Sequence, residues 1–275
     1  MGLFKSNLEI QRVSEPINIS FIGSGNLAWH LAPALDNAGF VVKEVYSRNP
    51  GNAEALTERL YQAEVKASLD FSASVSSVFI IAASDDAIEE IATEIILPDE
   101  AFLLHTSGSQ PLSLLQFAAI DNIGSFYPLQ TFSKNKRIDF KTVPIFIESN
   151  DKTTELLMMT LGKAISNNVK KIGSEERKAL HVAAVFASNF VDHMLTVSKE
   201  ILEKNSLSFE LLRPLINETI AKSLALGPEN ALTGPAKRGD LEILDSHIEF
   251  LQRDEAVAEI YKLISQDIIN RYNPG

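Results

Sequence analysis

The sequence predicts an α/β protein in which a mainly parallel sheet domain is followed by an all-helical C-terminal domain. Two observations lead to this fold class. Up to Gly173, short apolar runs of strand length alternate with stretches of helical periodicity, which is typical of a parallel sheet covered by helices. After Gly173 no convincing strand pattern occurs, and apolar residues recur at helical spacing. We therefore expect one domain over residues 1–173 and a second over residues 174–275.

Each expected strand of the first domain is an apolar run that ends at polar or glycine residues. These runs cover residues 17–23, 41–47, 78–84, 101–107, 124–130, 143–149 and 168–173. Helical patterns cover residues 26–39, 51–62, 86–96 and 151–166. Because the two kinds of element alternate, the pattern predicts a single sheet with helices on both faces.

The second domain is expected to begin with a helix that has Ser174 as its N-cap and acidic residues in its first turn. This helix contains the stretch LHVAAVFASNFV, which is apolar almost all round. A helix of that kind is predicted to be buried on every face and to form the spine of its domain. Further helices are expected near residues 208–226, 240–252 and 254–270, with a long loop at 227–240.

The composition is that of a soluble globular protein and excludes several kinds of function. The 275 residues carry a net charge of −11, which argues against nucleic acid as a partner. Cysteine is absent, which excludes disulfides and thiolate metal sites and suits a cytoplasmic location. No apolar run was judged long enough to cross a membrane, and no metal-binding spacing was found.

A glycine-rich turn follows the first expected strand and opens the first expected helix. Its pattern is Gly23-x-Gly25-x-x-Ala28, in which the first glycine permits a tight turn and the second lets a pyrophosphate approach the backbone. In this strand–turn–helix context the pattern predicts a dinucleotide-binding, Rossmann-type domain, although a tight turn without a ligand is the alternative. The predicted cofactor-binding residues of the turn are Gly23, Ser24, Gly25, Asn26 and Leu27.

The end of the second strand indicates which dinucleotide is bound. NAD-binding domains hold an acidic residue there, which accepts hydrogen bonds from the ribose 2′-hydroxyl. This sequence has Ser47 and Arg48 instead, and a guanidinium and a hydroxyl suit the 2′-phosphate of NADP. Glu44 competes if the strand ends earlier than expected, and Arg48 is otherwise a solvated turn residue. We predict NADP as the cofactor.

Two further strand ends belong at the same edge of the sheet, where ligands bind. Ala83, Ser84 and Asp85 follow one of these strands and are predicted to line the cofactor site. Capping of the next helix by Ser84 or Asp85 is an equally good explanation for those two residues.

Six sequence blocks together resemble one bacterial family. They are IGSGNLAWHLAPAL, YSRN, LLHTSGSQPLSLL, SFYPLQTFS, HVAAVFASNF and LTGPAKRGD. The family pairs a Rossmann-like N-terminal domain with a helical C-terminal domain of unknown function, and its members are described as NADP oxidoreductases. More distantly the chain is similar to pyrroline-5-carboxylate reductase, 6-phosphogluconate dehydrogenase and the deazaflavin-dependent NADP reductases. These relatives imply that the helical domain dimerises and completes the substrate site, but they imply no particular substrate.

The candidates for proton transfer lie on the first helix of the second domain. Histidine suits this step, and His181 opens the apolar stretch near the expected domain junction. Helical spacing places Asn189 and His193 on one broad face with it. Relatives use a lysine and an asparagine on the equivalent helix, and the resemblance implies an orienting role for Asn189. No lysine holds the matching place, so His181 is a candidate replacement acid. The alternative is that His181 and Asn189 are buried polar groups with a structural role.

Other polar residues are candidates for substrate binding. Ser107, which follows His105 and Thr106, resembles the serine of a Ser-Gly pair that binds substrate in hydroxyacid dehydrogenases. In the loop at 227–240, Thr233 and Arg238 could reach an anionic substrate, although a rigid Gly-Pro turn explains that loop as well.

Together these features predict an NADPH-dependent oxidoreductase that reduces a small carbonyl or imine compound at an interdomain cleft. We expect a cytoplasmic homodimer. The alternative, favoured by the missing lysine, is a non-catalytic NADP(H)-binding sensor or partner protein.

Overall fold

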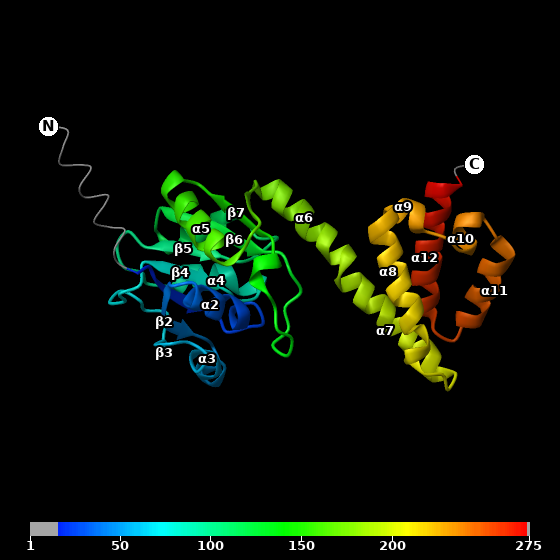
Figure 1. Cartoon of the computed structure of the whole chain (residues 1–275), viewed down its shortest axis with the longest axis horizontal. Helices are drawn as coiled ribbons and strands as arrows, with labels where there is room; N and C mark the ends of the chain where they lie inside the picture. Colours follow the sequence, from blue (N-terminus) through cyan, green and yellow to red (C-terminus); the bar gives the residue numbers. More distant parts are fainter. Residues whose placement is uncertain (1–15, 274–275) are drawn as a thin grey trace. The chain divides into compact units, whose positions relative to one another are not determined.

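The computed structural model describes residues 16–273 and falls into two compact units (Figure 1). One unit extends to Ser188 and the other begins at Asn189. The division falls one helix later than the boundary predicted at Gly173. The helix that begins at Ser174 is counted with the sheet because Arg177 and Ser174 bond to residues of the first unit.

The first unit is built on one eight-stranded sheet, in the order β3-β2-β1-β4-β5-β6-β7-β8. All pairings are parallel except β6 with β7, so the prediction of a mainly parallel sheet is confirmed. The strands are β1 (Asn18–Ile22), β2 (Val41–Tyr46), β3 (Glu64–Lys66), β4 (Val78–Ile81), β5 (Phe102–His105), β6 (Asn122–Pro128), β7 (Ile145–Ser149) and β8 (Val169–Lys171). Only β3 was missed, because it is three residues long and largely exposed.

Helices cover both faces of the sheet. The α-helices of this unit are α2 (Ala28–Asn37), α3 (Pro50–Thr57), α4 (Ile88–Glu94), α5 (Lys152–Ile165) and α6 (Ser174–Ala187). Three 3-10 helices accompany them: η1 (Asp85–Ala87), η2 (Leu112–Ala118) and η3 (Phe140–Thr142). Side chains alternate along each strand, so Phe21 packs with α2, α3 and α5 on one face while Ile22 packs with α4 and η2 on the other.

The second unit is helical, and no strand is described from Ser174 to Asn273, as the sequence predicts. Its elements are α7 (Asn189–Lys204), η4 (Phe209–Leu212), α8 (Arg213–Leu226), α9 (Pro228–Ala231), α10 (Pro235–Arg238), α11 (Leu241–Leu251) and α12 (Glu255–Tyr272). The predicted loop at 227–240 thus contains the short helices α9 and α10. Within this unit, α12 packs against α10 and α11, and α8 packs against α9.

The apolar stretch LHVAAVFASNFV differs from expectation in two ways. It is broken at Ser188, whose φ of −127° and ψ of −73° end α6 before α7 begins. No described residue from Lys178 to Lys204 is buried, so the prediction of burial on every face is wrong for the single chain. Residues Ser174–Lys204 are also long and apolar enough, by length and composition alone, to cross a membrane, which corrects the sequence-based statement.

The start of α6 is fixed to the sheet by polar groups. Gly173, rather than Ser174, is the N-cap, and its N–H donates to Glu176 Oε2 at 2.8 Å. Ser174 Oγ instead donates to Glu148 on β7. The Arg177 side chain is only 1% exposed, and its Nη2 lies 3.0 Å from Glu148 Oε2. Arg177 Nη1 also donates to the carbonyl oxygen of Ser107 at 2.9 Å, so one guanidinium joins α6, β7 and the loop after β5.

Candidate functional site

A cavity of about 580 Å³ opens at the carboxyl ends of β1, β2 and β4. Ligands of open α/β sheets bind at this edge. Nine of the ten predicted cofactor-binding residues line this cavity, namely Gly23–Leu27, Ser47, Arg48, Ala83 and Ser84. The full lining is Ile22, Gly23, Ser24, Gly25, Asn26, Leu27, Tyr46, Ser47, Arg48, Asn49, Asn52, Leu69, Ala82, Ala83, Ser84, Ala87, Glu90, Ile91, Glu94 and Lys134.

The glycine turn has the geometry that a dinucleotide site needs. Gly23 has a φ of +112°, and a Cβ built on it would lie 2.3 Å from the carbonyl oxygen of Ala82, so no other residue fits there. At Gly25, which is exposed, a Cβ would meet no protein atom closer than 4.0 Å. The space beside Gly25 therefore belongs to the cavity. Leu27 makes no side-chain cap to α2, and although the N–H groups of Trp29 and His30 bond to the carbonyls of Gly25 and Leu27, those just before them at the helix start suit an anion.

Arg48, just after β2, lines the cavity, whereas Glu44, the acidic residue of β2, does not. The Glu44 carboxylate accepts a hydrogen bond from Ser20 Oγ at 2.7 Å and another from Ser74 Oγ. It also lies 3.5 Å from Lys66 Nζ and does not line the cavity. Arg48 does line it and is exposed. The competing interpretation, in which Glu44 binds the ribose, therefore has no support in the structure.

Two features of the lining were not found in the sequence. Lys134 reaches the cavity from the segment between β6 and β7, far along the chain from the glycine turn. Glu90 and Glu94 of α4 bring negative charge to the same cavity. The short string FSKNKR carries no recognised spacing, so only its cluster of cations could have drawn attention to Lys134.

Of the predicted cofactor residues, Asp85 alone does not line the cavity. Its carboxylate accepts a hydrogen bond of 2.5 Å from Ser109 Oγ, in the loop after β5. Ser84 occupies the N-cap position of η1 but makes no side-chain cap hydrogen bond. Asp85 therefore tethers one edge loop to another, whereas Ser84 lines the cavity.

The hydroxyl of Ser107 is used within its own turn. Ser107 Oγ accepts hydrogen bonds from the N–H groups of Ser109 at 3.1 Å and Gln110 at 3.0 Å. The side chain is 6% exposed. Ser107 thus shapes the loop, and its Oγ also lies 3.4 Å from Ser109 Oγ, whose own hydrogen goes to Asp85.

A tyrosine near the carboxyl end of β6 lies beside a histidine of α6. Tyr127 Oη lies 3.1 Å from His181 Nδ1. Gly108 makes the pairing possible, because a Cβ there would lie 2.6 Å from His181 Nδ1 and 2.7 Å from Tyr127 Cζ. Burial raises the pKa of Tyr127, the Asp85 charge raises it further, and Arg177 opposes the rise. Tyr127 therefore keeps its proton at neutral pH. Sequence analysis missed it because a tyrosine in an apolar strand carries no signal.

His105 is a buried, neutral imidazole. Its Nδ1 accepts a hydrogen bond from the Ser107 N–H at 3.2 Å, so its proton is on Nε2, which has no hydrogen-bond partner among the described residues. Burial, assisted by the Arg177 charge and opposed by Asp85, lowers the pKa of His105 to about 3.

The remaining predicted residues are dispersed. Asn189 and His193 follow the break at Ser188 and belong to the other compact unit, so the angular argument, which assumed an unbroken helix, does not apply. Thr233 is exposed, and Arg238 Nη2 lies 2.7 Å from Asp240 Oδ2. Asp240 is the N-cap of α11 by position, but its side chain makes no cap hydrogen bond.

Comparison with known proteins identifies the family. A Bacteroides fragilis protein, described in its crystal structure as a proposed NADP oxidoreductase, is 37% identical to this chain with a TM-score of 0.85. The match covers 93% of this chain and 98% of that one. Residues 18–104 match the family described as NADP oxidoreductase coenzyme F420-dependent, and residues 143–268 match a domain of unknown function, DUF2520. This chain belongs to that NADP oxidoreductase family.

More distant structures share the fold. A reductive aminase from Aspergillus terreus, solved with NADPH and ethyl levulinate, is 14% identical with a TM-score of 0.68, and the match covers 94% of this chain and 95% of the aminase. An imine reductase from a Pseudomonas species is 15% identical with a TM-score of 0.66, covering 92% and 93% of the two chains. Among curated proteins none matches this chain. A single helix that passes these criteria, such as the one over 174–204, is weak evidence for a membrane span.

The state of His105 makes a prediction about stability in acid. In the unfolded chain the imidazole takes up a proton near pH 6.5, whereas in the folded protein it stays neutral down to about pH 3. The wild type should therefore lose stability as pH falls through this window, relative to His105→Asn, by at most about 1.4 kcal/mol per pH unit. Asparagine does not titrate and offers Oδ1 to the Ser107 N–H. Urea unfolding at pH 7 and pH 5 measures the difference, and equal losses in the two proteins would contradict it.

Proposed function

We propose that this protein is an NADPH-dependent reductase of small carbonyl or imine compounds. One observation carries the proposal: the glycine turn, Ser47 and Arg48 line the same cavity, while the acid of β2 is held outside it. Membership of an NADP oxidoreductase family supports the same cofactor.

The cavity offers a matching group for each part of the cofactor. Backbone N–H groups at the start of α2 suit the pyrophosphate. Ser47 and Arg48 suit the 2′-phosphate, since a guanidinium fork pairs with phosphate oxygens and aspartate would repel them. Leu69 and Ile91 line the cavity with apolar surface suited to the adenine ring.

The strand order indicates the direction in which the cofactor would extend. The residues suited to the adenosine half, Ser47 and Arg48, lie at the end of β2. The glycine turn follows β1, and Ala83 and Ser84 follow β4. The next strands in the sheet are β5 and β6, whose ends carry Ser107 and the Tyr127–His181 pair. The nicotinamide half would therefore point toward these polar residues.

His181 is the proposed acid, and Tyr127 is the proposed positioning residue. When bound, NADPH supplies a hydride to the substrate carbon. In the protonated imidazole, Nδ1–H donates to Tyr127 Oη, which leaves Nε2–H to protonate the substrate oxygen or nitrogen. The raised pKa of Tyr127 makes its hydroxyl a poor proton source, so we assign the transfer to the histidine. The substrate roles of Ser107, Asn189, Thr233 and Arg238 stay predictions.

The substrate class is supported by the structural neighbours. The reductive aminase and the imine reductase both carry names that refer to carbon–nitrogen bonds. A screen of small ketones with amines, cyclic imines and aldehydes, followed by loss of NADPH absorbance, tests turnover. Failure of every oxidant to consume NADPH, with tight binding of the cofactor, would favour the non-catalytic sensor instead.

A cytoplasmic homodimer is part of the proposal. No described residue from Lys178 to Lys204 is buried, and we propose that a second copy of the chain covers this apolar stretch. Sedimentation velocity should show a dimer for the wild type. Val182→Glu, in which α6 gains a charge at a residue that is 48% exposed, should shift the protein to monomers. Leu156→Glu, at a residue of α5 that is 57% exposed, is the control and should remain dimeric. A monomeric wild type would overturn this part of the proposal.

Arg48 should select between the two coenzymes. Arg48→Ala removes the cation from the end of β2 and should weaken NADPH binding by about 10- to 100-fold, which corresponds to one charge-assisted phosphate contact. NADH binding should change little, because NADH lacks the 2′-phosphate. Arg48→Lys keeps the charge and should recover part of the affinity. Calorimetry measures the dissociation constants of both coenzymes for the wild type and the two variants, and equal weakening of NADPH and NADH in Arg48→Ala would contradict the phosphate role.

His181 should affect turnover more than cofactor binding. His181→Ala removes the proton donor, so kcat should fall by about 100-fold or more while the Kd for NADPH stays within about twofold. Tyr127→Phe keeps the acid but loses its orienting hydrogen bond and should cost less. Unchanged turnover in His181→Ala would remove this residue from the mechanism.

A further inference from the structure

The segment between β6 and β7, residues 129–144, brings a second cation to the cofactor cavity. We propose that Lys134, on this segment, is a ligand of the 2′-phosphate together with Arg48. The inference rests on the proposed function, because it requires that NADPH binds in the cavity. It adds a determinant of coenzyme selectivity that no motif near the glycine turn contains.

The segment is held against α2 by specific contacts. His30 Nε2 on α2 lies 2.9 Å from the carbonyl oxygen of Ser133. The Phe132 ring lies 5.9 Å from the ring of His30 and 6.0 Å from that of Phe140, between ring centroids. The two ends of the segment are joined by a hydrogen bond of 2.8 Å from the Leu129 N–H to the Pro144 carbonyl. The backbone that carries Lys134 is therefore fixed before any ligand arrives.

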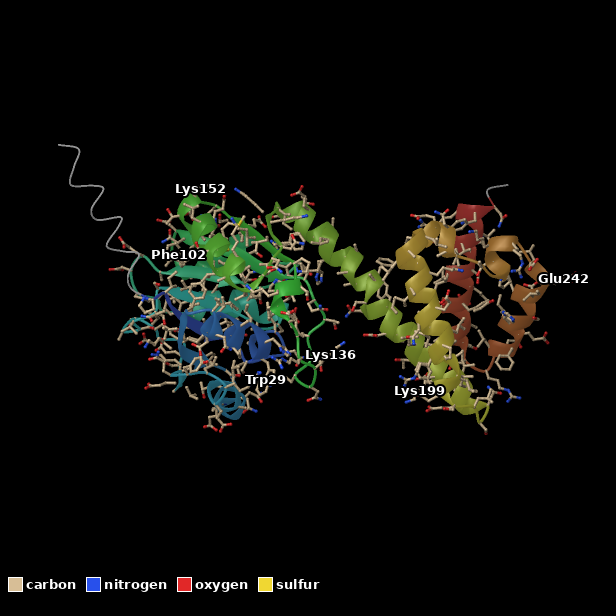
Figure 2. The ribbon with its side chains drawn as sticks, in the orientation of Figure 1. Trp29, Phe102, Lys136, Lys152, Lys199 and Glu242 are labelled. Carbon is tan, nitrogen blue, oxygen red and sulfur yellow. The ribbon has the colours of Figure 1, made fainter. Side chains whose placement is uncertain are left out.

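The side chain of Lys134 is also placed by its surroundings. Its Nζ lies 4.8 Å from the centroid of the Trp29 ring, and the Arg59 guanidinium carbon lies 4.1 Å from the same centroid. Lys134 is half-buried and lines the cavity, whereas Lys136, two residues later, is exposed and does not line it. Figure 2 labels Lys136 and Trp29 and shows where this segment passes α2. Lys134 and Lys136 therefore differ in access to the cavity, although they lie on the same loop.

Electrostatics favours the 2′-phosphate as the partner of Lys134. A phosphate monoester carries about −1.5 to −2 charges at neutral pH, so one arginine leaves it incompletely neutralised. Glu90 and Glu94 line the same cavity and oppose an anion there. The pyrophosphate already has the N–H groups at the start of α2. A second fixed cation is therefore most useful at the monoester.

The experiment measures binding alone. Lys134→Met keeps an unbranched apolar stem beside Trp29 and removes the charge, and Lys136→Met is the matched control. Calorimetry is carried out with NADPH, NADH, adenosine 2′,5′-bisphosphate and 5′-AMP. We expect Lys134→Met to weaken NADPH and the bisphosphate by about 10-fold and to leave NADH and 5′-AMP within about twofold. Lys136→Met should leave all four unchanged, and Lys134→Arg should keep most of the affinity.

Three results would overturn the inference. Equal weakening of NADPH and NADH in Lys134→Met would assign the lysine to the pyrophosphate. Unchanged binding of the bisphosphate would leave Lys134 without a role in the site, and an equal effect of Lys136→Met would reduce the result to a general effect of charge. If the wild type prefers NADPH and Arg48→Ala loses that preference, any of these three results refutes only the role of Lys134 and leaves the proposed function standing. A wild type that binds neither coenzyme refutes the proposed function itself.

Discussion

The buried guanidinium of Arg177 is the interaction on which the arrangement of the site depends. It is 1% exposed, and it joins the carboxylate of Glu148 on β7 to the carbonyl of Ser107 after β5. A charge this deeply buried is tolerated only when its hydrogen bonds are satisfied, and breaking such a pair costs about 3–5 kcal/mol. His181 lies four residues later on α6, on the same face of the helix. The contact that fixes α6 to the sheet therefore also sets the position of His181 beside Tyr127.

How far the sequence could predict the site depended on whether the residues concerned are close together in the chain. The glycine turn and Arg48 belong to one strand–helix–strand unit, so their spacing alone indicates a dinucleotide site. Lys134 and Tyr127 come from elements that only the folded sheet brings to this edge. The sheet order places β6 two strands from β4, and no local pattern contains that information. The sequence left the role of Glu44 open for the same reason, since its two serine partners lie on β1 and before β4.

The apolar stretch of α6 and α7 shows a different limit. Hydrophobicity all round a helix reports that the helix is covered by something, but it does not say by which chain. In the single chain no described residue between Lys178 and Lys204 is buried. The same composition passes simple criteria for a membrane helix. Residues of the sheet domain were predicted well because their cover comes from the same unit, where strand alternation and helix periodicity point to one core.

The protein is strongly acidic as a whole, whereas the charged side chains that line the cavity, two cations and two carboxylates, sum to zero. A net charge of −11 repels an extended polyanion, whose many phosphates experience the whole surface. A single dinucleotide experiences mainly the groups within about 8 Å, because salt screens the rest at physiological ionic strength. The N–H groups at the start of α2 and the cations Arg48 and Lys134 share the cavity lining with Glu90 and Glu94. Removing one of these cations leaves the carboxylates in excess beside a bound phosphate monoester, whereas removing a surface lysine elsewhere changes only the screened background.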